Sequence, residues 1–173
     1  MKFSPTPIAG VQLVTADLMS DARGFFARLS CPQEFAGQGI EFQPLQTSLS
    51  RNTHLHTLRG MHYSHRPEGK LVRCVRGRVL DVVFDIRRDS PTFGASTSVI
   101  LDADAANAIY IAPGLAHGFL TLQPDCDVLY QIDQIFQPGF DAGLRWNDPL
   151  FGFQWPAAPA VIGERDAAYP DFR

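Results

Sequence analysis

The chain has 173 residues, of which 45% are hydrophobic, and this predicts one domain over residues 1–173 with a sizeable core. Its formal net charge of −3 excludes the basic surface that is typical of proteins binding nucleic acid or anionic membranes. No stretch approaches the roughly 18 consecutive apolar residues of a membrane-spanning helix.

Runs of β-branched and aromatic residues recur along the chain and predict many short strands. They lie at residues 10–15, 40–50, 70–76, 78–86, 96–101, 108–112, 117–122 and 127–136. Residues 70–86 are the clearest hairpin candidate, with Gly77 at the turn. Helix is expected only in short pieces at 32–36 and 103–107, and the Pro- and Ala-rich segment from Trp155 is expected to be surface coil. The pattern predicts an all-β sandwich or barrel, whose open mouth would suit a ligand.

The cysteines and the N-terminus bear on the compartment. Cys31, Cys74 and Cys126 are widely spaced and form no CxxC pair, which indicates free thiols in a reducing cytoplasm. The first residues contain no apolar region of the kind found in secretion signals. A cytoplasmic protein is therefore expected.

Residues 58–73 concentrate charge in a chain that is otherwise sparing with it. They include Arg59, His62, His65, Glu68, Lys70 and Arg73. A neutral histidine can accept a proton at pH 7, and lysine and arginine can hold an anion. This combination predicts proton abstraction beside a group that becomes negative. Two histidines and a glutamate could instead hold a metal.

His62 is the first candidate for a general base. If residues 58–62 are extended, Gly60 and His62 share one face of the strand. Arg59 and Met61 would then share the other face. Gly60 would let a ligand or a neighbouring backbone approach closely. His62 is either a base inside a pocket or a hydrogen-bonded structural histidine.

Two further residues, His117 and Lys70, allow two interpretations each. His117 follows a Pro-Gly turn at the start of an apolar strand, as a rim residue or as a structural histidine. Lys70 either points inward to stabilise an oxyanion or outward as an ordinary strand-end charge. Asp81 and Asp85 on the following strand are possible partners for Lys70.

Tyr130 and Asp166 are equally open from the residues alone. Tyr130 could deliver a proton as a phenolic acid or pack as a core tyrosine. Asp166 would ordinarily be a solvated charge, but an aspartate bonded to a catalytic histidine fixes its tautomer. The sequence does not place Asp166 beside His62.

A metal site would draw on His62, His65, Glu68 and His117. Residues three apart on a strand face opposite sides of the sheet. His62 and His65 would therefore converge only through a turn, and the metal site is not favoured.

Several ordered motifs carry a resemblance that covers about residues 10–170. They are Asp21–Phe26, Leu58–His62, Gly69–Cys74, Asp81–Arg87, Ser90–Gly94, Ala116–Phe119, Leu129–Tyr130 and Asn147–Pro149. With these motifs the chain resembles the dTDP-4-dehydrorhamnose 3,5-epimerases. The resemblance implies a cupin-type jelly roll (a double-stranded β-helix), a homodimer, and an isomerase without metal or other cofactor. It also implies a nucleotide-linked 4-keto-6-deoxy sugar as substrate and a place in dTDP-rhamnose biosynthesis for cell-surface polysaccharide.

The family pattern implies a role for each matching residue. His62 would remove the proton next to the ketone, and Asp166 would be its dyad partner. Tyr130 would return a proton from the opposite face, and Lys70 would stabilise the enolate oxygen. These roles agree with the chemistry, because a hydrogen next to a ketone becomes acidic only when the enolate charge is stabilised.

The same pattern implies a set of binding residues. Arg59 and His117 would line the pocket for the sugar and pyrophosphate, and Arg23 and Phe26 would reach across from the partner subunit. Nucleotide recognition would fall to Gln46, Ser64 and Phe136.

The chain departs from the family pattern mostly at positions for nucleotide recognition. The departures are Arg28, Pro44, Gln46, Ser64 and Ile135. They leave the nucleotide base open, and the loss of a tyrosine near Phe136 would limit action to C3. The alternatives are a C3-only epimerase for a non-thymidine nucleotide sugar, a metal-dependent cupin enzyme, and a sugar-nucleotide binding module without catalysis.

Overall fold

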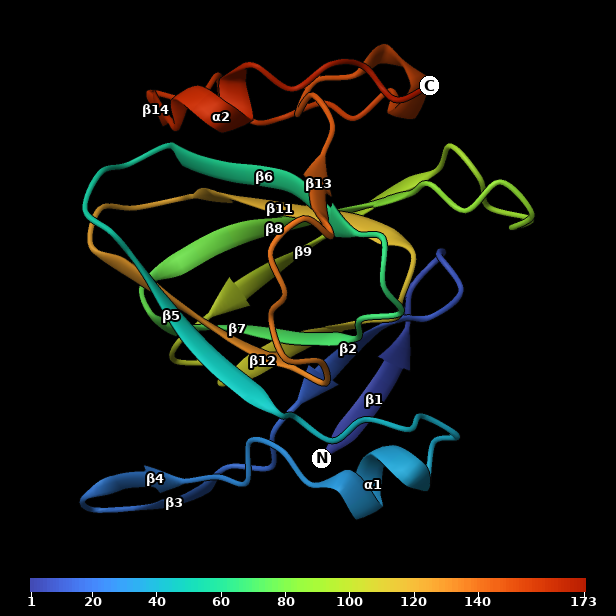
Figure 1. Cartoon of the computed structure of the whole chain (residues 1–173). Coiled ribbons are helices and arrows are strands. Elements are labelled where there is room, and N and C mark those ends of the chain that lie inside the picture. Colours follow the sequence, from blue (N-terminus) through green and yellow to red (C-terminus); the bar gives the residue numbers. More distant parts are fainter.

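Two facing β-sheets form the body of the protein (Figure 1), which a computed structural model describes over residues 1–173. The first sheet has the order β1 (Lys2–Pro5), β2 (Val11–Thr15), β10 (Asn107–Ile111), β7 (Lys70–Arg76), β12 (Cys126–Ile132) and β5 (Gln46–Asn52). The second has the order β13 (Asp141–Gly143), β6 (Thr57–Ser64), β11 (Leu115–Thr121), β8 (Arg78–Asp85) and β9 (Ser96–Asp102). Neighbouring strands come from distant parts of the chain, as in a jelly roll. The predicted all-β architecture is confirmed.

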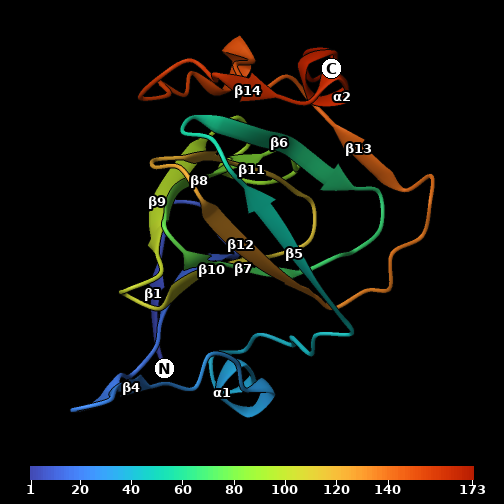
Figure 2. The same ribbon diagram turned by 90° about the vertical axis from the view of Figure 1, so that its left-hand side faces the viewer.

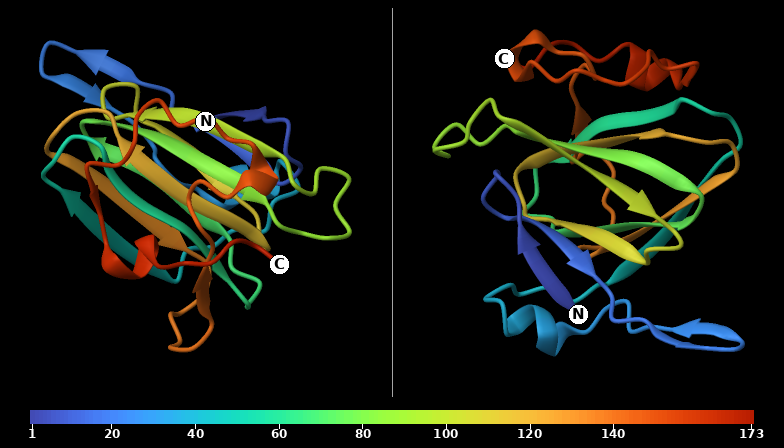
Figure 3. Two further views of the ribbon diagram at one scale, coloured as in Figure 1. Left: turned by 90° about the horizontal axis from the view of Figure 1, so that it is seen from above. Right: turned by 180° about the vertical axis from the view of Figure 1, so that it is seen from behind.

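Short peripheral elements cover the two ends of the molecule. They are the hairpin of β3 (Met19–Asp21) and β4 (Gly24–Phe26), the helix α1 (Pro32–Ala36), the 3-10 turn Pro149–Phe151, β14 (Val161–Ile162) and the helix α2 (Glu164–Ala167). Figures 2 and 3 show β3–β4 and α1 on one side of the barrel and the C-terminal segment on the opposite side, next to β6. Neither helix has the length and apolar character needed to cross a membrane.

The predicted strands at 70–76 and 78–86 exist, but they do not form the predicted hairpin. β7 pairs with β10 and β12, whereas β8 pairs with β9 and β11 in the other sheet. Gly77, with φ of 82°, turns the chain from one sheet to the other. Val72 of β7 and Val83 of β8 therefore meet across the core instead of side by side.

The prediction of a helix at residues 103–107 is wrong, whereas the helix at 32–36 is confirmed as α1. The side chain of Asn107 accepts the N–H of Asp102 at 2.9 Å, and the side chain of Asp102 accepts the N–H of Asp104 at 3.0 Å. These side chains supply turn hydrogen bonds that compete with a helix.

The segment from Trp155 onward is more ordered than the predicted coil. Val161 and Ile162 form β14, which pairs in parallel with Thr57 and Leu58 of β6. The helix α2 follows, and it places Asp166 against the same strand. The C-terminal segment therefore pairs with β6 and packs against the second sheet.

Side chains alternate between the two faces of β8, so this one strand contributes to two hydrophobic clusters. Val79 and Val83 point between the sheets into the largest hydrophobic cluster. Val82 and Phe84 point outward, where the C-terminal segment covers them, and the ring of Phe151 stacks on Phe84 at 4.3 Å between centroids. Burial on both faces fixes the register of the central strands, because a slip of one residue would exchange the two faces.

Candidate active site

A cavity of about 280 Å³ lies between the two sheets. Its walls come from β5, β6, β7, β11 and β12, and are formed by Ser48, Leu49, Ser50, Arg59, His62, Lys70, His117 and Tyr130. The fold thus brings together five side chains that sequence reasoning singled out and that are far apart in the chain. They are Arg59, His62, Lys70, His117 and Tyr130.

His62 and Asp166 form a hydrogen-bonded pair at one wall of this cavity. His62 Nε2 lies 2.7 Å from Asp166 Oδ1, and Asp166 Oδ2 accepts the N–H of Gly60 at 2.9 Å. The imidazole is 43% exposed, whereas the carboxylate is 12% exposed. When Nε2–H is donated to the carboxylate, Nδ1 keeps a lone pair that can accept a proton.

The electrostatics of Asp166 favour its charged form. Burial on its own would raise the pKa of Asp166, but the hydrogen bonds from His62 and from the N–H of Gly60 outweigh it, so the pKa is lowered. Asp166 is therefore a carboxylate at neutral pH and can support a positive imidazolium on His62.

A β-bulge in β6 places Arg59 and His62 on the same wall. Arg59 lies opposite Phe119 of β11, and His62 lies opposite His117, so β6 takes three residue steps where β11 takes two. The extra residue reverses the alternation that we expected for residues 58–62. Gly60 permits the bulge, since its φ is 134° and an added Cβ would lie 2.6 Å from a backbone atom of β11.

His117 forms a second buried pair, with Asp81. Its Nε2 lies 2.8 Å from Asp81 Oδ2, and the two side chains are 5% and 0% exposed. Burial raises the pKa of Asp81, and the charge and hydrogen bond of His117 oppose that shift. From the sequence, Asp81 was expected only as a partner of Lys70, and its pairing with His117 was missed. The available signal was an acidic residue on the inward face of an apolar strand, which needs a buried polar partner.

Tyr130 faces the cavity from β12, in the sheet opposite His62. Burial raises the pKa of Tyr130, and the nearby charge of Asp81 adds to the effect. The phenol is therefore protonated at neutral pH and can donate that proton.

Lys70 points inward and pairs with neither Asp81 nor Asp85. Its Nζ lies 3.1 Å from Glu68 Oε1. Asp85 instead bonds Arg87 at 2.7 Å. Glu68, considered above only as a candidate metal ligand, is 17% exposed and contacts the lysine. The expectation that Asp81 or Asp85 partners Lys70 is wrong, because both are bound by other side chains.

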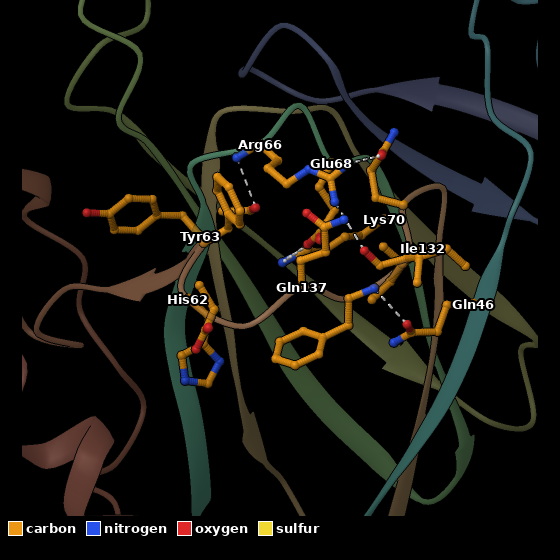
Figure 4. A pocket seen from close by; sticks show the side chains of 14 residues that line it. Gln46, His62, Tyr63, Arg66, Glu68, Lys70, Ile132 and Gln137 are labelled. Atoms are coloured by element: carbon orange, nitrogen blue, oxygen red, sulfur yellow. Dashed lines mark hydrogen bonds and ion pairs between the residues drawn. The ribbon is translucent and has the colours of Figure 1, made fainter.

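A smaller cavity adjoins the first and shares His62 and Lys70 with it (Figure 4). Gln46, Ser64 and Phe136 line this second cavity. Gln46 Oε1 accepts the N–H of Phe136 at 3.0 Å, which joins the strand β5 to the loop after β12.

Arg23 and Phe26 lie away from both cavities. They sit on the β3–β4 hairpin, where the side chain of Arg23 is 90% exposed and Phe26 is 69% exposed. Arg23 contacts only its neighbour Asp21, at 2.6 Å. Within one chain, these two residues and the catalytic candidates are not brought together.

The four residues of the metal alternative do not converge. No group of three or more His, Cys, Asp or Glu side chains is arranged to hold a metal ion. In both histidines the ring nitrogen Nε2 is hydrogen-bonded to a carboxylate, that of Asp166 for His62 and that of Asp81 for His117.

The lowered pKa of Asp166 gives a prediction for stability against pH. A carboxylate with a lowered pKa stabilises the fold above its ordinary pKa, about 3.9 for aspartate, and this contribution is lost as the pH falls through the lowered value. Asp166→Asn should lower the free energy of unfolding by about 1–2 kcal/mol at about pH 6, and by less near pH 3. Urea unfolding measures both, with Asp171→Asn, at an exposed ion pair, as control. A difference that does not change with pH would contradict this account.

Comparison with known proteins identifies the family that the chain matches. The model of the family described as dTDP-4-dehydrorhamnose 3,5-epimerase matches residues 5–173. The enzyme of that name from Methanothermobacter thermautotrophicus is 33% identical, over 99% of this chain and 95% of the relative. The similarity thus covers nearly the whole chain.

Solved structures agree with the sequence relatives. The dTDP-4-dehydrorhamnose 3,5-epimerase of Bacillus anthracis, with TDP and PPi bound, superposes with a TM-score of 0.95 at 31% identity and covers 99% of both chains. ChmJ from Streptomyces bikiniensis, a 3'-monoepimerase in complex with dTDP-quinovose, has a TM-score of 0.90 at 32% identity, over 96% of this chain and 86% of that chain. This cupin-type jelly-roll isomerase therefore belongs to the dTDP-4-dehydrorhamnose 3,5-epimerase family.

Proposed function

We propose that the chain epimerises a dTDP-linked 4-keto-6-deoxy sugar at C3 and C5 by proton transfer through an enolate. The observation that carries the proposal is the placement of a base and an acid on opposite walls of one cavity. His62 comes from β6 of one sheet, and Tyr130 comes from β12 of the other. Inversion of a carbon centre requires a proton to leave one face and return on the other, and this arrangement provides for both steps.

The first step is removal of a proton from the carbon next to the ketone. His62 Nδ1 takes the proton, the C–H electron pair becomes the enolate double bond, and the carbonyl electrons move to the oxygen. Asp166 supports the imidazolium that results. The ammonium of Lys70 stabilises the enolate oxygen, because a fixed cation inside a protein cavity is screened less than a cation in bulk water.

The second step returns a proton from the other side. Tyr130 donates its phenolic proton to the enolate carbon, the carbonyl re-forms, and the centre is inverted. The Tyr130 phenolate then takes a proton from solvent, and the His62 imidazolium gives one up to solvent. The enzyme thus returns to its starting state. Repetition at the carbon on the other side of the ketone would invert the second centre.

Binding of the substrate falls to the remaining side chains of the two cavities. Arg59 offers a guanidinium for the pyrophosphate, and its Nε is held by Asn52 Oδ1 at 2.8 Å. His117, fixed by Asp81, offers a polar contact to the sugar. Gln46, Ser64 and Phe136 line the adjoining cavity, where the nucleotide would lie.

The nucleotide is tested by competition among four substrates. The relatives described above carry dTDP sugars in their names, and this supports thymidine despite the departures at Gln46 and Ser64. The dTDP-, UDP-, GDP- and CDP-linked 4-keto-6-deoxyglucoses are compared, with proton NMR reading the configuration at C3 and C5. Inversion of the dTDP sugar with the highest kcat/KM supports the proposal, and turnover of another nucleotide sugar alone contradicts it. Inversion at C3 without C5 would restrict the reaction to one centre.

We further propose that the active protein is a homodimer in which Arg23 and Phe26 complete the partner's site. The β3–β4 hairpin extends away from its own barrel (Figure 2) and exposes Phe26 and Arg23, and neither lines a cavity with the catalytic candidates of its own chain. Residues 1–173 would then be one catalytic domain. Its three free thiols support a cytoplasmic location.

Mixing two defective variants tests the exchange of residues between subunits. Arg23→Ala removes the residue given to the partner, and His62→Ala removes the base from its own site. A mixed dimer contains one site that has both residues, so refolding the variants together should restore about a quarter of wild-type activity. Mixed dimers with no more activity than the separate variants would contradict the proposal.

A further inference from the structure

Glu68 stands in direct contact with the lysine of the proposed site. Its Oε1 lies 3.1 Å from Lys70 Nζ, and the two side chains are only 17% and 15% exposed. Both line the cavity that also contains His62 (Figure 4). The ion pair is thus largely removed from water and lines the same cavity as the proposed base.

The backbone around Glu68 is fixed to the end of β12. The N–H of Gly69 donates to Asp133 Oδ1 at 2.8 Å, and the N–H of Asp133 donates to the carbonyl of Gly69 at 3.2 Å. An added Cβ at Gly69 would lie 2.7 Å from Asp133 Oδ2, so the two segments are in close contact. Glu68 therefore projects from an anchored segment.

Asp133 is the other carboxyl group near Glu68, and its side chain accepts a backbone N–H. Burial raises the pKa of Asp133, and the charge of Glu68 also contributes. Its Oδ1 accepts the N–H of Gly69, and Asp133 forms no ion pair with Lys70. Glu68 is the carboxylate within ion-pair distance of Lys70.

We infer that Glu68 is a positioning residue that holds the ammonium of Lys70 in place beside the enolate oxygen. The inference rests on the proposed function. A lysine side chain has a flexible four-carbon stem. An anchored carboxylate at 3.1 Å restricts the movement of that stem, so that the cation needs no rearrangement when the enolate forms.

Glu68→Gln tests the inference because it keeps the shape of the side chain and removes the charge. We expect kcat to fall about tenfold while KM changes less than about twofold, because the loss falls on the transition state and not on substrate binding. Glu68→Asp should recover part of the loss. Glu41→Gln, at an exposed glutamate outside both cavities, should match wild type. An unchanged kcat, or a loss confined to KM, in Glu68→Gln would overturn the inference while leaving the proposed function intact.

Chemical labelling separates this inference from the proposed reaction. Limited acetylation followed by peptide mass spectrometry measures how fast the Lys70 amine reacts, without any substrate. Release from the carboxylate should raise the labelling rate at Lys70 several-fold in Glu68→Gln and leave the rate at exposed Lys2 unchanged. Equal labelling of Lys70 in both proteins would overturn the inference. Faster labelling of Lys70 in Glu68→Gln than in wild type, together with a wild-type protein that inverts no sugar, would support the ion pair and contradict the proposed function.

Discussion

Replacing His62 by alanine is expected to lower kcat by about 10³-fold or more, within the range that positioned acid–base groups contribute. The substitution removes the group that accepts the proton from carbon. Lys70 and Tyr130 would remain in place. His117 of the neighbouring strand β11 is also paired with a carboxylate, but its side chain is only 5% exposed, against 43% for His62. The fold should persist because the imidazole is 43% exposed and leaves no closed cavity behind.

Solvent exchange measures this effect more directly than product formation. Exchange of the sugar hydrogens with deuterated water should disappear in His62→Ala, while circular dichroism remains that of the folded protein and the free energy of unfolding falls by no more than about 1–2 kcal/mol, the loss expected for Asp166→Asn. His54→Ala is the matched control, since His54 lies in an exposed loop before β6. Exchange at the wild-type rate in His62→Ala would remove His62 from the mechanism.

Replacing Tyr130 by phenylalanine should have a different signature. Inversion should fall by about 10²–10³-fold, because the proton can no longer be returned from the opposite face. His62 would still form the enolate and return a proton on its own face. We therefore expect deuterium to enter the sugar with retention of configuration, since proton exchange between His62 and solvent continues.

Two measurements on the same sample distinguish exchange from inversion. Mass spectrometry counts the deuterons, and proton NMR reads the configuration. Tyr110→Phe is the control, because Tyr110 packs with Phe35 and Phe42 on the outer face of the first sheet. Equal loss of exchange and inversion in Tyr130→Phe would show that the phenol acts before or during enolate formation, and would contradict its role as the returning acid.

The strands that the sequence predicts best are those with long apolar runs. Residues 78–86 and 108–112 carry many β-branched side chains, and both form strands of the core. β6 was not among the predicted runs, because Arg59, Gly60 and His62 interrupt its apolar pattern. Two of these residues, Arg59 and His62, line the cavity. A functional strand is thus harder to predict than a structural one.

Pairings between strands depend on the whole fold and were predicted less well. The turn at Gly77 fits a hairpin locally, yet the two strands enter different sheets because each has better partners elsewhere in the chain. Likewise, Asp166 lies 104 residues from His62, and only the resemblance to a family suggested their contact. The bulge at Gly60 could not be predicted from alternation, because it depends on the close approach of β11.

The partners of charged side chains were the least predictable part of the site. Lys70 had two candidate carboxylates on the next strand, and it pairs with the closer Glu68 instead. Asp81 meets His117 across neighbouring strands of one sheet, and an acidic residue on the inward face of an apolar strand does not by itself identify that partner. Such pairs follow from strand register, and register follows from burial over the entire sheet.

Deuterium incorporation into dTDP-4-keto-6-deoxyglucose by the wild-type protein tests the central claim most directly. The sugar is incubated with the protein in deuterated water, and mass spectrometry follows the mass while NMR follows the configuration. The proposed mechanism predicts deuterium at C3 and C5 that accumulates together with inversion and is absent without protein. A sugar that binds and gains no deuterium would contradict enolate chemistry at this site.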